Sequence, residues 1–112
     1  SASNNFSPAE QAWGTWIDGK TIYRKIFTDI AYKSNGALTN GNIDLSELSI
    51  ETVINLECCR MADKTNGSYP VSSNAYVWVA SDKTLQGGVT AGVSSISAGK
   101  YTFIAIYYTK AN

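Results

Sequence analysis

One run near the C-terminal end of the sequence constrains the fold more than any other feature. Residues 100–110 read KYTFIAIYYTK. Strand alternation divides these residues between two faces, Tyr101, Phe103, Ala105 and Tyr107 on one and Thr102, Ile104, Ile106 and Tyr108 on the other. Both faces carry large apolar side chains, whereas a strand with one wet face alternates apolar with polar residues. The run therefore predicts a strand that is covered on both sides.

Other runs carry the same β-type composition, and turn sequences separate them. Residues 20–27, 50–61 and 74–81 are rich in β-branched and aromatic residues. Asp18-Gly19 predicts a two-residue type I′ hairpin turn, because this dipeptide tolerates the positive φ angles that the turn requires. Asn-Gly pairs mark a loop at residues 33–42, and residues 62–70 form another loop. We expect no helix longer than the single turn that begins near Asp44.

These elements predict an all-β fold, most simply an antiparallel two-sheet β-sandwich of the jelly-roll-like kind. The length of 112 residues and the hydrophobic content of 44% suit one domain. We assign residues 13–112 to the β-sandwich domain and residues 1–12 to an N-terminal extension or linker. From Thr84 to the end, the only charged residues are Lys100 and Lys110, so this region lacks the charges that keep monomers apart. The runs at residues 74–81 and 100–110 also carry apolar side chains on both faces, more than a single two-sheet domain needs to bury. We therefore expect a homo-oligomer.

The charge balance and the cysteines exclude several classes of partner and of covalent framework. Nine basic and nine acidic residues leave no basic excess, so we expect no nucleic-acid partner. No apolar run approaches the roughly 18 residues of a membrane-spanning helix, so we expect no membrane insertion. Cys58 and Cys59 are adjacent and point to opposite faces of a strand, which predicts that no disulfide forms between them.

The residue types available for catalysis and for metal binding are few. The chain contains no histidine, which removes the commonest general base and the usual zinc ligand. The segment TNGNID carries oxygen-bearing residues but lacks the full ligand series of a calcium loop. We predict a non-enzymatic protein that has neither a cofactor nor a metal. A carboxylate pair for glycoside cleavage could still come from four acidic residues that otherwise read as a solvated face: Asp44, Glu47, Glu51 and Glu57.

Two stretches carry more information than their strand alternation: GTWIDGKTIYRKIF at residues 14–27 and IAIYYTKAN at residues 104–112. Together they resemble the C-terminal head or tip domain of bacteriophage tail-fibre and minor structural proteins. In that family a stretch close to GTWIDGKPIYRK opens the domain, and an aromatic strand ending in YTK closes it. This chain has Thr21 where proline is expected, and ECCRM where a glycine-containing segment is expected.

The resemblance implies a homotrimeric tip domain of a virion fibre, made in the cytoplasm of the host bacterium. Its partner would be a glycan or a protein of the bacterial surface. The alternative is a structural knob that promotes trimerisation or decorates the virion without binding a receptor.

Aromatic and polar residues give two places for a receptor site. Trp13, Trp16 and Tyr23 could form a platform for a sugar ring, but the resemblance favours a scaffold role for them. Loops on a rigid scaffold carry recognition more often, and Asn35, Asn40 and Asn42 offer amides in one of them. Asp82 and Lys83 follow the strand that bears Trp78, and Tyr69 lies at the entry to the segment before that strand. A hairpin could therefore bring all four residues to one rim of the domain. We therefore predict a receptor-binding patch of four residues: Tyr69, Trp78, Asp82 and Lys83.

Overall fold

The computed structural model describes residues 7–62, 68–69, 74–92 and 95–111, so most of the predicted loop at 62–70 lies outside the described residues. Within these ranges, the chain forms strands and one turn of 3-10 helix, Ser46–Leu48. None of the described segments is a helix long and apolar enough to cross a membrane. The strands are β1 (Gln11–Thr15), β2 (Thr21–Tyr32), β3 (Ile43–Asp44), β4 (Ile50–Ala62), β5 (Ser68–Tyr69), β6 (Ala75–Val79), β7 (Thr84–Val89) and β8 (Gly99–Lys110).

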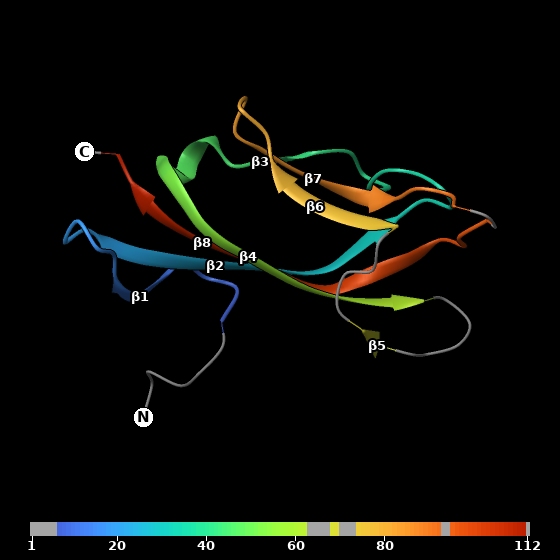
Figure 1. Cartoon of the computed structure of the whole chain (residues 1–112), viewed down its shortest axis with the longest axis horizontal. Coiled ribbons are helices and arrows are strands. Elements are labelled where there is room, and N and C mark those ends of the chain that lie inside the picture. Colours follow the sequence, from blue (N-terminus) through green and yellow to red (C-terminus); the bar gives the residue numbers. More distant parts are fainter. Residues whose placement is uncertain (1–6, 63–67, 70–73, 93–94, 112) are drawn as a thin grey trace.

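The strands form two antiparallel sheets. The larger sheet has the order β1-β2-β8-β4-β5, and the smaller has the order β3-β7-β6. The small sheet lies over one face of the large one (Figure 1). The prediction of an all-β fold with two antiparallel sheets is thus confirmed. β8 lies in the middle of the large sheet between β2 and β4, which explains why it has no polar face.

The main core fills the space between the two sheets, on what we call the inner face of the large sheet. Ile104, Ile106 and Tyr108 project from β8 into this core and are buried. The small sheet contributes Leu85 and Val89, which are also fully buried. At roughly 1.5–3 kcal/mol for each large apolar side chain, this burial is the main force that holds the sheets together.

A second apolar cluster covers the opposite, outer face of the large sheet. Ala105 and Tyr107 of β8 and Ile22 and Ile26 of β2 are buried there. Trp16, Ile54 and Phe103 are partly buried and pack against them. Both faces of β8 are therefore covered, and the side chains that cover them belong to the same chain. These contacts account for the apolar residues of β8 without a second copy of the protein, and the oligomeric state remains a prediction.

One face assignment from the sequence is wrong. Tyr101 lies in the inner core with Ile104, although simple alternation placed it with Phe103. The register of β4 against β8 shifts beside Thr102, which adds one residue to β8 as a β-bulge does. Asp29, at the same level of the neighbouring strand β2, has a φ of 55°. The extra residue changes the phase of the alternation and turns Tyr101 inward.

The hairpin predicted at Asp18-Gly19 is present, but its turn type is different. Trp16 N–H donates to the Lys20 carbonyl at 2.8 Å, and Gly19 N–H donates to the Trp16 carbonyl at 2.9 Å. Only Gly19 has a positive φ, of 88°, so the turn is not type I′. This pattern is the three-residue hairpin loop that ends in a left-handed residue. Asp18 Oδ1 accepts a hydrogen bond from Lys20 N–H at 2.9 Å and so favours the longer loop.

The first strand begins before the predicted domain boundary. β1 starts at Gln11, two residues ahead of the boundary drawn at residue 13. Just before it, the Glu10 carboxylate pairs with Lys110 Nζ at 2.7 Å and accepts a hydrogen bond from the Tyr108 hydroxyl. The chain from Glu10 onward therefore packs on the large sheet. Cys58 and Cys59 are both free.

Candidate functional site

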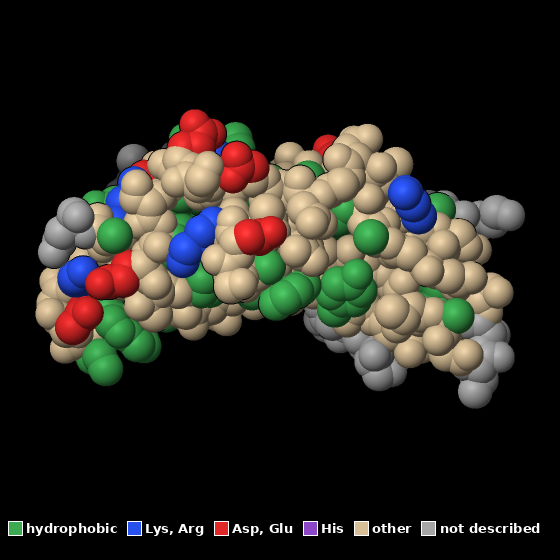
Figure 2. All heavy atoms as spheres, turned by 90° about the horizontal axis from the view of Figure 1, so that it is seen from above, with side chains coloured by type: hydrophobic (Ala, Val, Ile, Leu, Met, Phe, Trp, Pro, Cys, Tyr) green, Lys and Arg blue, Asp and Glu red, His purple; other side chains and the backbone are tan. Residues whose placement is uncertain are grey.

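Two aromatic side chains project from the outer surface of the small sheet. Tyr76 and Trp78 alternate on β6 and are 37% and 49% exposed. Val77 and Val79, between and after them, pack against the inner core. Figure 2 looks onto this side of the molecule, where most visible charged side chains gather over one half and hydrophobic side chains reach the surface beside them. Tyr76 and Trp78 are large aromatic residues of the kind that usually fills a core, yet here they are in contact with water.

Polar groups on the neighbouring strand complete this surface. Gln86 of β7 is the cross-strand partner of Trp78, and such partners have Cβ atoms about 4.5–5.5 Å apart. Gln86 Nε2 donates to Thr84 Oγ1 at 3.0 Å, which fixes the amide next to the indole ring. An aromatic face beside an amide can stack on a sugar ring and hydrogen-bond its hydroxyls. We call Tyr76, Trp78 and Gln86 the aromatic strip.

The turn that follows the aromatic strip holds Asp82 and Lys83, and both have structural roles. Asp82 Oδ1 accepts hydrogen bonds from Thr84 N–H at 3.1 Å and from Thr84 Oγ1 at 2.6 Å. Lys83 has a φ of 64°, and its N–H donates to the Ala80 carbonyl at 3.0 Å. The turn therefore repeats the geometry of the first hairpin, with lysine at the glycine position. A receptor-binding role for these two residues remains a prediction.

Tyr69 lies on a different sheet from the other predicted site residues. It belongs to β5, at the edge of the large sheet, and pairs with Arg60 of β4. β6 pairs instead with β7, so no hairpin joins Tyr69 to Trp78. In Figure 1 the β6–β7 turn and β5 lie toward opposite sides of the molecule. The structure thus brings Trp78, Asp82 and Lys83 onto one hairpin and leaves Tyr69 out of it.

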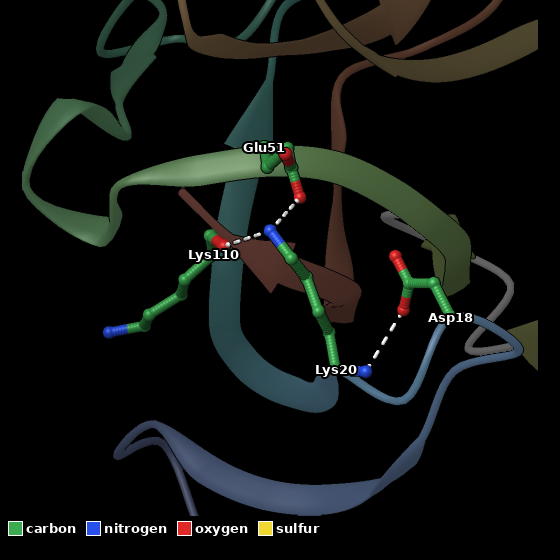
Figure 3. Close-up of polar contacts among 4 residues, drawn as sticks. All are labelled: Asp18, Lys20, Glu51 and Lys110. Atoms are coloured by element: carbon green, nitrogen blue, oxygen red, sulfur yellow. Dashed lines mark hydrogen bonds and ion pairs between the residues drawn. The ribbon is translucent and has the colours of Figure 1, made fainter. Parts of the chain in front are cut away.

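The two stretches that resemble fibre-tip domains are neighbours in the large sheet. Tyr23 of β2 is paired with Tyr108 of β8, and their rings stack with centroids 6.2 Å apart. Lys20 Nζ donates to Glu51 Oε1 at 2.6 Å and reaches the Lys110 carbonyl at 3.4 Å (Figure 3). These contacts tie the first hairpin to the last strand, which is a scaffold role.

Trp13, Trp16 and Tyr23 do not form one platform. Trp16 packs in the outer cluster and Tyr23 packs against the inner core, on opposite faces of the sheet. Trp13 is 57% exposed and meets the Tyr107 ring edge-on, with centroids 5.1 Å apart. The scaffold interpretation therefore suits Trp16 and Tyr23, while Trp13 is another exposed aromatic residue and belongs to the large sheet rather than the small one.

Three of the four acidic residues considered for catalysis have separate local partners. Asp44 Oδ1 accepts a hydrogen bond from Ser46 N–H at 2.9 Å, and hydrogen bonds from Ser46 lower the pKa of this carboxyl. Glu51 pairs with Lys20, and Glu57 accepts a hydrogen bond from the Tyr107 hydroxyl at 2.7 Å. In the described ranges, no group of three or more His, Cys, Asp or Glu residues is placed to hold a metal ion.

The fold and these side chains define a two-sheet antiparallel β-domain with an exposed aromatic strand. Comparison of the chain with family models, with curated proteins and with solved structures finds no match. The sequence prediction omitted Tyr76 from the site. Its signal was present, because alternation in AYVWVA already put Tyr76 and Trp78 on one face.

Proposed function

We propose that this chain is a non-enzymatic attachment domain at the tip of a virion fibre, and that it binds a glycan or a protein of the bacterial surface. One observation carries the proposal: Tyr76 and Trp78 are exposed side by side on β6 while the core beneath them is complete. Exposed aromatic residues flanked by polar groups are typical of recognition surfaces. The resemblance of residues 14–27 and 104–112 to fibre-tip domains supports the virion location.

We further propose a jelly-roll-like homotrimer. The pairing of β2 with β8 and of β3 with β7 supports the jelly-roll-like description, since in each sheet an early strand of the chain lies beside the last strand of that sheet. The trimer follows from the resemblance, and three copies would multiply weak binding through avidity. Light scattering at micromolar concentration should show particles of three chains, and a stable monomer would contradict the trimer.

The aromatic strip gives a direct test of attachment. We expect the fluorescently labelled domain to bind host cells, and Trp78→Ala to weaken binding about tenfold or more, because an aromatic anchor contributes at least about 1.4 kcal/mol. Trp13→Ala is the matched control, since it removes a comparably exposed tryptophan from another sheet. Both variants should keep the wild-type oligomeric state and melting temperature.

A structural knob without receptor binding is the second candidate. It is favoured by the scaffold roles of the family-like residues Lys20, Tyr23 and Lys110, and by the turn roles of Asp82 and Lys83. If the correctly assembled domain binds host cells no better than non-host cells, the result would support the structural knob. Binding that survives Trp78→Ala but is lost in Trp13→Ala would move the site to the large sheet.

A further inference from the structure

A separate pocket lies where the loop after β2 passes back over the end of that strand. Its cavity has a volume of about 240 Å³. Apolar and polar side chains share its lining: Ile30, Leu38 and Ile43 on one hand, and Asp29, Asn40 and Asn42 on the other. Binding pockets combine apolar walls with a few polar groups in this way. The volume is below the roughly 300–1,000 Å³ of pockets for drug-sized ligands, so it suits a single ring.

The amides of this pocket differ from three polar side chains of the described loops, those of Asn35, Asp18 and Asp82. Asn35, in the same loop, uses Oδ1 to accept a hydrogen bond from Ile96 N–H at 2.7 Å. Asp18 and Asp82 use their carboxylates to support the two hairpin turns. By contrast, within the described ranges the Asn40 and Asn42 side chains make no hydrogen bond. Both side chains are exposed, and no described residue of the protein occupies their donors and acceptors.

Asp29 reaches the pocket through an unusual backbone conformation. Its φ of 55° falls in the left-handed region, although it lies inside β2. The pairs Thr28 with Phe103 and Ile30 with Tyr101 hold the strand in place on either side of it. Sparsely populated backbone conformations at non-glycine residues cluster at ligand sites, because surrounding structure must enforce them. The break in strand alternation that turns Tyr101 into the core thus lies at the same level of the sheet as Asp29, which lines the pocket.

The charge of the pocket indicates what kind of ligand it takes. Lys100 Nζ lies 2.9 Å from Asp29 Oδ1, so the carboxylate is already matched by a cation. A bound metal ion would compete with Lys100, whereas a neutral polyol can accept from the ammonium and donate to the carboxylate. Apolar side chains such as Leu38 can contact the C–H face of a sugar ring. We propose, resting on the attachment function above, that this pocket binds one neutral hexose ring of a bacterial surface glycan.

The test follows the side-chain amide signals of Asn40 and Asn42 by NMR in the ¹⁵N-labelled domain. The probes are methyl glycosides of glucose, galactose, mannose and N-acetylglucosamine at millimolar concentrations, each titrated separately. We expect saturable shifts of these signals with at least one probe. Asn42→Ala should weaken that response about tenfold or more, whereas Asn55→Ala, which removes an exposed asparagine of β4, should leave it unchanged. Unaltered spectra outside the pocket confirm that both variants fold.

Other responses would overturn the site. Shifts at Asn40 and Asn42 with calcium chloride and none with the sugars would make it a cation site. Sugar shifts confined to Trp78 and Tyr76 would leave attachment standing and remove the pocket, as would no response to any probe in a domain that still adsorbs to host cells. A saturable sugar response at the pocket in a domain that adsorbs to no host would support the pocket and contradict the attachment function.

Discussion

The hydroxyl of Tyr101 joins the two sheets, and its removal tests that junction. Tyr101 is fully buried in the inner core. Its hydroxyl donates to the Tyr76 carbonyl at 2.7 Å and accepts from Gly88 N–H at 3.2 Å, so it contacts β6 and β7 at once. Burial raises the pKa of this hydroxyl to about 12, which keeps the proton needed for donation at any ordinary pH. Tyr101→Phe removes one oxygen and keeps the ring.

The structure sets the magnitude of this effect. A typical hydrogen bond contributes about 0.5–1.5 kcal/mol net, and a buried polar group left without a partner costs about 1–3 kcal/mol. In Tyr101→Phe the ring still fills the core, so no large cavity adds to the loss. We therefore expect the free energy of unfolding to fall by about 2 kcal/mol. Urea denaturation followed by tryptophan fluorescence measures it, with an unchanged slope against denaturant.

Tyr107→Phe is the matched control, because its hydroxyl donates to the exposed Glu57 carboxylate at 2.7 Å, where water can replace it. We expect this control to lose less than about 1 kcal/mol. Hydrogen exchange should also show faster exchange of β6 and β7 amides than of β2 amides in Tyr101→Phe. Equal losses for the two variants would refute the role of the Tyr101 hydroxyl as the junction between the sheets.

Further predictions concern the two hairpins and acid stability. Gly19 and Lys83 both have a positive φ. Gly19→Val should therefore lower the free energy of unfolding by about 1–3 kcal/mol, and Lys83→Gly should raise it by about 0.5 kcal/mol. Denaturant midpoints measure both changes, and a loss of stability in Lys83→Gly would contradict the geometry that the two hairpins share. Burial raises the pKa of Glu10, but hydrogen bonds from Lys110 and Tyr108 outweigh it and lower this pKa overall. This contribution to stability is present at neutral pH and is lost as the pH falls below about 4.3 through the lowered value. Glu10→Gln should therefore flatten the acid side of the stability curve in thermal melts, and an unchanged curve would exclude the contribution.

Local sequence chemistry predicted the long strands β2, β4 and β8 but failed where the pairing of two strands decides the structure. The strand at residues 50–61 was expected from its composition alone, and β4 covers Ile50–Ala62. The face of Tyr101 could not be predicted, because the register shift beside Thr102 depends on how β8 pairs with β4. Asp18-Gly19 signalled a turn, yet the loop length was decided by the hydrogen bond of Trp16 N–H to Lys20.

The candidate sites show the same limit. Asn35 and Asn40 have the same side chain and lie in one loop, so the sequence treats them alike. A contact with Ile96, 61 residues away from Asn35, distinguishes the structural amide of Asn35 from that of Asn40, which makes no hydrogen bond to the described part of the chain. The receptor-binding role predicted for Trp78 stays a prediction. The sheet that receives Tyr69 depends on a pairing with Arg60 that no local pattern encodes.

The position of β8 also decides when the large sheet can form during protein synthesis. β8 is the last described strand in the chain, yet it lies between β2 and β4 and pairs with both. While residues 99–110 are still inside the ribosome, the nascent chain contains β2 and β4 but lacks the strand that pairs with both. Pairing between such distant segments is slow, and unpaired strand edges aggregate easily. The large sheet can therefore be completed only after residues 99–110 have left the ribosome, and until then the edges of β2 and β4 that pair with β8 stay exposed.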